Sequence, residues 1–162
     1  MVPFALKRLS SALAFDVRHQ AGERWLEAGR ASYAQAGVRA DVRPFIEDMS
    51  EAYAWADLVI CRAGALTVSE LAAVGVAAVL VPFPNAVDDH QAYNAQYLVR
   101  EGAAVLISDR ELTAERLATE LQRLCAGRGK LLAMAERARL LAKPRAAAEL
   151  AASCLQLARR AA

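Results

Sequence analysis

The sequence predicts an α/β domain, with a Rossmann-like parallel sheet that carries helices on both faces. Short apolar runs alternate with helical periods along the chain, at the spacing that βαβ units require. Two of the runs, residues 58–61 and 77–81, are continuously apolar, which is typical of strands buried on both faces of a parallel sheet. The length of 162 residues suffices for one such domain and is too short for two.

The first half of the chain supplies two strands and three helices. Gly37 stands where a left-handed residue ends a helix, and Met49, Ala52, Tyr53 and Ala56 share one side of a short helix. The opening helix has no strand before it and lacks the Gly-rich turn that usually starts a doubly wound half. The expected elements are a helix over roughly 3–14, a strand over 15–19, a helix over 23–36, a strand over 38–42 and a helix over 48–56.

The second half continues the alternation and ends in helices. Gly75 closes one helix, Pro82 and Pro84 stop the strand before them, and Gly102 follows another helix. The expected elements are strands over 58–61, 77–81 and 104–107, and helices over 67–74, 89–100, 112–125, 130–142 and 145–160. The whole chain is expected to be one domain, 1–162, with 144–162 as a C-terminal helix.

The charge balance argues against a dedicated nucleic-acid binder. Lys and Arg number 20 against 18 Asp and Glu, a net charge of only +2. Residues 110–162 are nonetheless basic, with 11 basic and 5 acidic residues. This region could favour an anionic surface, although a solvated face of Ala/Arg helices is the more ordinary interpretation.

The cysteines and the N-terminus indicate where the chain resides. Cys61, Cys125 and Cys154 are far apart, have no metal-ligand spacing, and are odd in number, which fits buried thiols in a reducing compartment. The first residues lack the pattern of a secretory signal, and no apolar stretch reaches the ~20 residues of a membrane span. We expect a cytoplasmic chain, at most peripheral to a membrane.

The segment from Cys61 to Leu71 carries the most chemistry. A buried strand ends at Cys61, a turn with Gly64 follows, and a helix starts near Thr67. This arrangement presents free backbone amides and the positive helix end, which suit a phosphate or diphosphate, and Gly64 would let the anion approach closely. Thr67 and Glu70 fit either a capping box or ligand contact, and for Glu70 the ligand would be a ribose diol; the residues alone leave both open.

Three further segments follow strands. Polar side chains crowd the stretch from Asp88 to Asn94, where Gln91 and Asn94 share a helix face; a helix start capped by Asp88 or Asp89 is an equal alternative. His19 to Gly22 could form another wall of the same crevice. Phe45 and Ile46 could flank a flat ring, although a hydrophobic staple is the ordinary explanation. His19 and His90 are the only histidines, and neither has a carboxylate at a metal-binding interval, so no metal site is expected.

Six motifs, in this order, resemble the C-terminal half of the MurG family over roughly residues 2–155. This family is the UDP-N-acetylglucosamine:N-acetylmuramyl-(pentapeptide) pyrophosphoryl-undecaprenol N-acetylglucosaminyltransferase of peptidoglycan synthesis. The motifs are His19-Gln20-Ala21-Gly22, Phe45-Ile46-Glu47-Asp48-Met49, Tyr53-Ala54-Trp55-Ala56-Asp57, Arg62 to Leu71, Val81-Pro82-Phe83-Pro84, and Asp88-Asp89-His90-Gln91 with Asn94-Ala95.

The resemblance implies the donor-binding C-terminal domain of a two-domain, inverting GT-B glycosyltransferase that converts lipid I to lipid II without a cofactor. Ile46 would contact uracil through its backbone, Ala65 to Thr67 would lie near the diphosphate and sugar, and Glu70 would bind the ribose. Gln91, with His90 and Asn94 nearby, would bind the N-acetylglucosamine hydroxyls. The residues expected at the donor are Ile46, Gly64, Ala65, Leu66, Thr67, Val68, Ser69, Glu70, His90, Gln91 and Asn94.

The sequence departs from the family pattern in two places. Gly75-Val76-Ala77 replaces the usual Gly-x-Pro, and the family's first strand with its Gly-rich loop, together with its acceptor-binding domain, has no counterpart here. The acceptor, a lipid-linked muramyl-pentapeptide, would therefore bind through another domain, and no catalytic residue is assigned. This chain alone is expected to be inactive. A donor-binding subunit of a split glycosyltransferase and an inactive truncated fragment remain alternatives.

Overall fold

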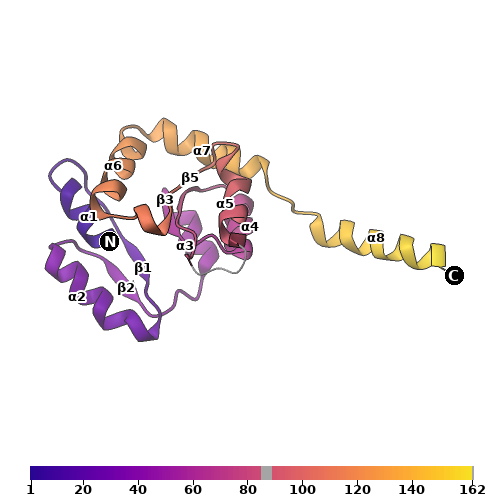
Figure 1. Ribbon diagram of the computed structural model, residues 1–162, viewed down its shortest axis with the longest axis horizontal. Helices are drawn as coiled ribbons and strands as arrows, with labels where there is room; N and C mark the ends of the chain where they lie inside the picture. Colours follow the sequence, from indigo (N-terminus) through magenta and orange to yellow (C-terminus); the bar gives the residue numbers. More distant parts are fainter. Residues whose placement is uncertain (85–88, 162) are drawn as a thin grey trace.

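Five short parallel strands form two sheets in the computed structural model, which describes residues 1–84 and 89–161 (Figure 1). The strands are β1 (Arg18–Gln20), β2 (Asp41–Arg43), β3 (Leu58–Cys61), β4 (Ala77–Leu80) and β5 (Ala104–Leu106). One sheet has the order β1-β2 and the other β3-β4-β5, and every pair is parallel. The α/β class is confirmed, but the strands of the described ranges form two sheets instead of one.

Helices connect the strands in sequence order. They are α1 (Val2–Leu9), α2 (Leu26–Ala36), α3 (Met49–Trp55), α4 (Ala65–Val74), α5 (His90–Val99), α6 (Ala114–Cys125), α7 (Arg128–Leu140) and α8 (Ala146–Ala161), with 3-10 turns η1 (Glu23–Trp25) and η3 (Asp109–Glu111). The opening helix ends at Leu9, earlier than expected. The first strand is shifted, because pairing with β2 begins at Arg18, while Phe15 and Val17 pack on the core from the preceding loop. Gly37 ends α2 in the left-handed conformation, as predicted, with φ 68°.

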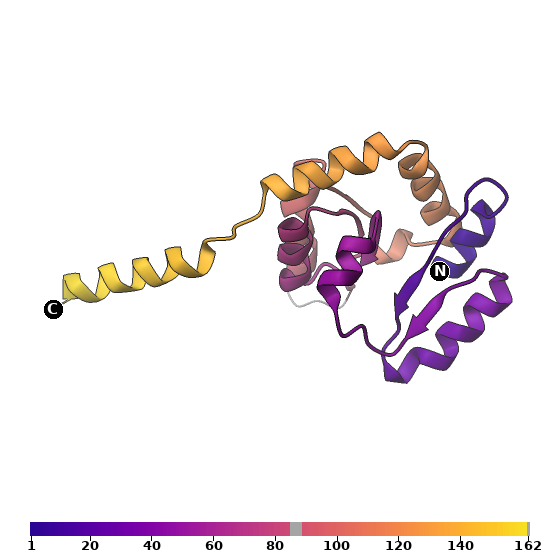
Figure 2. The same cartoon turned by 180° about the vertical axis from the view of Figure 1, so that it is seen from behind.

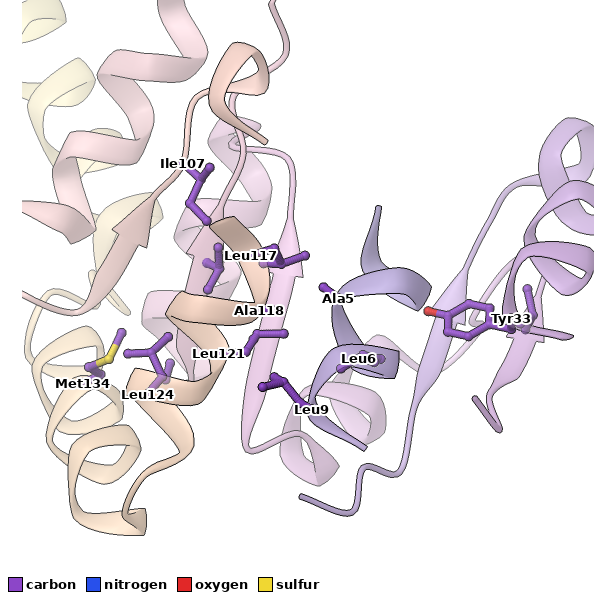
Figure 3. Close-up of a cluster of buried hydrophobic side chains, with 13 residues drawn as sticks. Ala5, Leu6, Leu9, Tyr33, Ile107, Leu117, Ala118, Leu121, Leu124 and Met134 are labelled. Carbon is purple, nitrogen blue, oxygen red and sulfur yellow. The ribbon is translucent and has the colours of Figure 1, made fainter. Parts of the chain in front are cut away.

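Strand β4 separates two apolar clusters. Ala77 and Val79 face the cluster that includes α1 and α6, while Ala78 and Leu80 face the cluster that includes α4 and α5. This alternation places helices on both faces of the three-stranded sheet, as the sequence predicted. Figure 3 shows the first cluster, in which side chains of α1 and α6 lie against one another.

A slot separates the edges of β1 and β3. Val17, Leu58 and Ile60 are among the residues that line a cavity of about 1870 Å³ here. All four residues of β3 are only half-buried, whereas all four of β4 are buried. The expectation that residues 58–61 are buried on both faces was therefore wrong, because β3 is an edge strand of its sheet and borders this slot.

Helix α8 projects away from the rest of the chain, as both views show (Figures 1 and 2). Its described side chains are exposed, and Arg159 and Arg160 lie in its last turn. Cys154 on this helix is exposed, so the expectation of three buried thiols was wrong for this residue. Cys61 and Cys125 are half-buried, and burial raises the pKa of the Cys61 thiol to about 12. No helix within residues 1–84 and 89–161 is long and apolar enough to cross a membrane.

Candidate nucleotide-sugar site

At the carboxyl end of β3, the amino end of α4 presents backbone amides that have no acceptor among the described residues. The ladder of α4 begins where the Val68 amide donates to the Gly64 carbonyl at 2.9 Å. The amides of Ala65, Leu66 and Thr67 precede this bond, so no carbonyl of the helix lies within their reach. They point outward from the positive end of the helix dipole and can therefore bind an anion.

Gly64 is the N-cap of α4 and adopts an extended conformation, with φ −63° and ψ 148°. Any residue can take this conformation, so the backbone itself does not require glycine. A Cβ placed on Gly64 would lie 3.6 Å from Thr67 Oγ1, over the first turn of the helix. The missing side chain therefore leaves open the space through which an anion would reach the amides.

The capping box between Thr67 and Glu70 is not present. The helix begins at Ala65, two residues earlier than expected, which places Thr67 at the third helical position and Glu70 in the second turn. Glu70 instead accepts a hydrogen bond from Tyr53 Oη at 3.1 Å. Burial, and then the bond to Glu70, raise the pKa of Tyr53, so its phenol stays protonated and can hold the carboxylate.

Two other predicted residues of α4 serve the helix itself. Val68 is buried in the core, with only 4% of its surface exposed, and Ser69 Oγ donates to the Ala65 carbonyl at 3.0 Å. Leu66, in contrast, is 80% exposed beside the free amides. The structure thus places residues 64–67 and Glu70 at the carboxyl edge of the sheet. The side chains of Val68 and Ser69 are instead engaged in the core and in the helix.

Helix α5 begins at the carboxyl end of the neighbouring strand, β4. Asp89 occupies its N-cap position with a positive φ of 51°, but its side chain makes no cap hydrogen bond, so capping by Asp89 was wrong. Asp88, the other cap candidate, lies outside the described residues. Gln91 Oε1 accepts from the Phe83 amide at 2.9 Å, and Asn94 Nδ2 donates to the Ala63 carbonyl at 3.1 Å. The side-chain amides of Gln91 and Asn94 therefore tie α5 to the loops that follow β3 and β4. His90 is exposed at the first position of the helix.

The loop after β2 joins the same edge through Gln20, at the end of β1. The Ile46 amide donates to Gln20 Oε1 at 2.9 Å. Ile46, Gln20 and Thr67 all line the cavity that extends from the slot, so residues from the loop after β2, from the end of β1 and from the first turn of α4 face one space. His19, the neighbour of Gln20, instead lies 3.1 Å from Tyr33 Oη through its Nδ1 and packs edge-on against that ring.

The site also includes residues that the sequence reasoning did not assign to it. Tyr53 holds Glu70, and Arg62 pairs with Asp109 at 2.6 Å. Gln20, which holds Ile46, belongs to the segment that was expected to form another wall of the crevice. Arg62 stands at a strand end, which was a usable signal, because ligands bind there in parallel sheets. Tyr53 and Asp109 gave no local signal. Within the described ranges, no group of three or more His, Cys, Asp or Glu residues could hold a metal ion.

Comparisons with known proteins identify the family of the chain. The model of the glycosyltransferase family 28 C-terminal domain matches residues 2–150. A Marinobacter nauticus protein named UDP-N-acetylglucosamine--N-acetylmuramyl-(pentapeptide) pyrophosphoryl-undecaprenol N-acetylglucosamine transferase is 55% identical over 157 residues, which are 97% of this chain and 43% of that protein. A relative of the same name from an Azoarcus species is 59% identical over 157 residues, 97% of this chain and 44% of its own.

A solved structure extends the likeness to three dimensions. The crystal structure of Acinetobacter baumannii MurG is similar with a TM-score of 0.85 and 46% identity, over 92% of this chain and 43% of that one. The chain therefore spans less than half the length of the relatives that it matches.

Proposed function

Because the chain belongs to the glycosyltransferase family 28 C-terminal domain family, we propose that it binds UDP-N-acetylglucosamine as the donor-binding half of a GT-B N-acetylglucosaminyltransferase. The reaction would transfer N-acetylglucosamine, with inversion, to a lipid-linked muramyl-pentapeptide and so convert lipid I to lipid II. The names of the relatives describe this activity, and the geometry of the carboxyl edge supplies the physical argument.

The observation that carries the proposal is the start of α4 with Glu70 beside it. The amides of Ala65, Leu66 and Thr67 would hold the diphosphate, since an anion there is stabilised by the unsatisfied donors and the helix dipole. Glu70, oriented by Tyr53, would accept hydrogen bonds from the ribose hydroxyls. The Ile46 amide is bonded to Gln20, which leaves the Ile46 carbonyl to accept from the uracil N3–H.

The sugar would lie toward the start of α5. Gln91 and Asn94 carry amide groups that can both donate to and accept from sugar hydroxyls, and His90 stands beside them. Gln91 directs its oxygen to Phe83 and keeps its nitrogen as a donor. In the transfer step, the same α4 amides would stabilise the negative charge that develops on the departing UDP.

The acceptor and the base that removes its proton are proposed to belong to the part of the relatives that this chain does not match. That part, on the same chain or on a separate one, would also make the peripheral contact with the inner face of the membrane. The nearly balanced charge, +2 over 162 residues, supports a donor domain that does not bind nucleic acid.

Calorimetry with UDP and with UDP-N-acetylglucosamine tests the proposal. We expect both ligands to bind and Glu70→Ala to weaken both by about tenfold or more, because a hydrogen-bonded charged group is lost. Glu136→Ala, an exposed glutamate of α7, is the matched control and should leave both affinities unchanged. Unchanged affinity in Glu70→Ala would refute the ribose assignment, and no binding by the unaltered chain would refute the proposed function.

A further inference from the structure

Arg62 joins three strand ends at the carboxyl edge of the larger sheet. It follows β3 directly, and its Nη1 donates to the carbonyls of Val81 and Pro82, at 3.4 and 3.2 Å, in the segment after β4. The same nitrogen donates to Asp109 Oδ1 at 2.6 Å, in the segment after β5. One guanidinium group therefore links the loops after β3, β4 and β5.

The contacts continue from Arg62 to α5. The guanidinium carbon lies 5.5 Å from the centre of the Phe83 ring, and the Phe83 amide donates to Gln91 Oε1 at 2.9 Å. Asn94 makes a second tie, to Ala63, the residue that follows Arg62. The position of Gln91 relative to the start of α4 thus depends on the loop that Arg62 holds.

We propose that Arg62 is a positioning residue for recognition of the donor's sugar, an inference that rests on the proposed function. It fixes the backbone of Val81, Pro82 and Phe83 and so sets the distance between the sugar-facing amide of Gln91 and the diphosphate-facing end of α4. The Arg62–Asp109 pair is half-exposed, at 49% and 33% of the side-chain surface, and such pairs add little stability. We therefore expect the Arg62–Asp109 pair to order the loop more than it stabilises the fold.

The two parts of the ligand should depend differently on Arg62. The ribose and diphosphate contacts are made by α4 and do not involve the loop after β4, so UDP affinity should not depend on Arg62. The sugar contacts are made by α5, and Gln91 of α5 is bonded to that loop. Recognition of UDP-N-acetylglucosamine should therefore weaken selectively when Arg62 loses its planar group.

Arg62→Lys is the decisive variant, because lysine keeps the charge opposite Asp109 but cannot reach both carbonyls and stack on Phe83. We expect UDP affinity to stay within about twofold, while UDP-N-acetylglucosamine affinity falls by about tenfold. Arg116→Lys is the matched control: Arg116 is 47% exposed and pairs with Glu120 in α6, so neither affinity should change. Hydrogen exchange at the Phe83 amide provides a readout without ligand and should become faster in Arg62→Lys alone.

Each outcome has a defined consequence. Equal losses of both affinities, or no loss of either, would overturn the positioning role of Arg62. Unchanged exchange at the Phe83 amide would do the same, because the loop would then be held by other contacts. Failure of the unaltered chain to bind either ligand would overturn the proposed function and the sugar role together, while the exchange rate would still report whether Arg62 orders the loop.

Discussion

Gly64 is a residue at which folding and binding can be separated. Its extended backbone suits any residue, and a Cβ would meet Thr67 Oγ1 at an ordinary contact distance of 3.6 Å. We expect Gly64→Ala to keep its free energy of unfolding within about 0.5 kcal/mol of the unaltered chain. The same methyl group would stand over the first turn of α4, so affinity for UDP should fall by about tenfold.

The measurements are urea unfolding and calorimetry on the same preparations. Gly129→Ala in α7 is the control, because a Cβ there meets nothing within 4 Å, and it should leave UDP affinity unchanged. A Gly64→Ala variant that binds UDP with normal affinity would show that the diphosphate does not approach the amides over Gly64.

At the residue scale, the sequence identified the positions that follow strands and missed the contacts that orient them. Thr67-x-x-Glu70 matched a local pattern for capping, but Gly64 starts the helix and Glu70 bonds to Tyr53, 17 residues away in the chain. Arg62 and Asp109 are 47 residues apart. Such pairs depend on how strands are brought side by side, and no local spacing encodes them.

Gly75 terminates α4 and also sets how closely α7 packs on it. Its φ is +76°, and a Cβ would lie 2.9 Å from Arg139 Cβ and 3.2 Å from the Ala135 carbonyl. Gly75→Ala should therefore lose about 1–2 kcal/mol of stability to the left-handed backbone and about 1–3 kcal/mol more to the clash.

Gly37→Ala at the end of α2 is the matched control for this loss. Its φ is +68°, but a Cβ would meet nothing within 4 Å, so only the backbone contribution of about 1–2 kcal/mol applies. Urea unfolding of both variants gives the comparison. If the two variants are equally destabilised, α7 adjusts its position without cost, and the packing argument fails.

At the element scale, the accuracy of the sequence prediction follows the strength of each local signal. The bounds of β3 were predicted correctly, because four consecutive apolar residues lie between Asp57 and Arg62. The predicted bounds of the first strand began too early, because Phe15 and Val17 are as apolar as strand residues but pack on the core from a loop. Pairing with β2, which local periodicity does not report, decides where β1 begins.

At the scale of the whole molecule, the division into two sheets is the feature that local patterns could not reveal. Alternate residues of a parallel strand direct their amides and carbonyls to opposite neighbours. The Val81 amide donates to the Cys61 carbonyl, so Cys61 and Val59 face β4, whereas Ile60 faces the slot. On the other side, the Ala21 amide donates to Arg43 across the β1–β2 pair, so Gln20 faces the slot from β1.

This alternation predicts a pattern of hydrogen exchange within one strand. The amide of Ile60 should exchange faster than those of Val59 and Cys61, because it points into a cavity of about 1870 Å³ while its neighbours point at β4. Strand β4 is the internal control, since it pairs with β3 and β5, so Val79 and Leu80 should both exchange slowly. Residue-resolved exchange by NMR measures all five amides in one experiment. Equal protection of Ile60 and Val59 would mean that the slot is closed by backbone pairing in solution, and the two sheets would then behave as one.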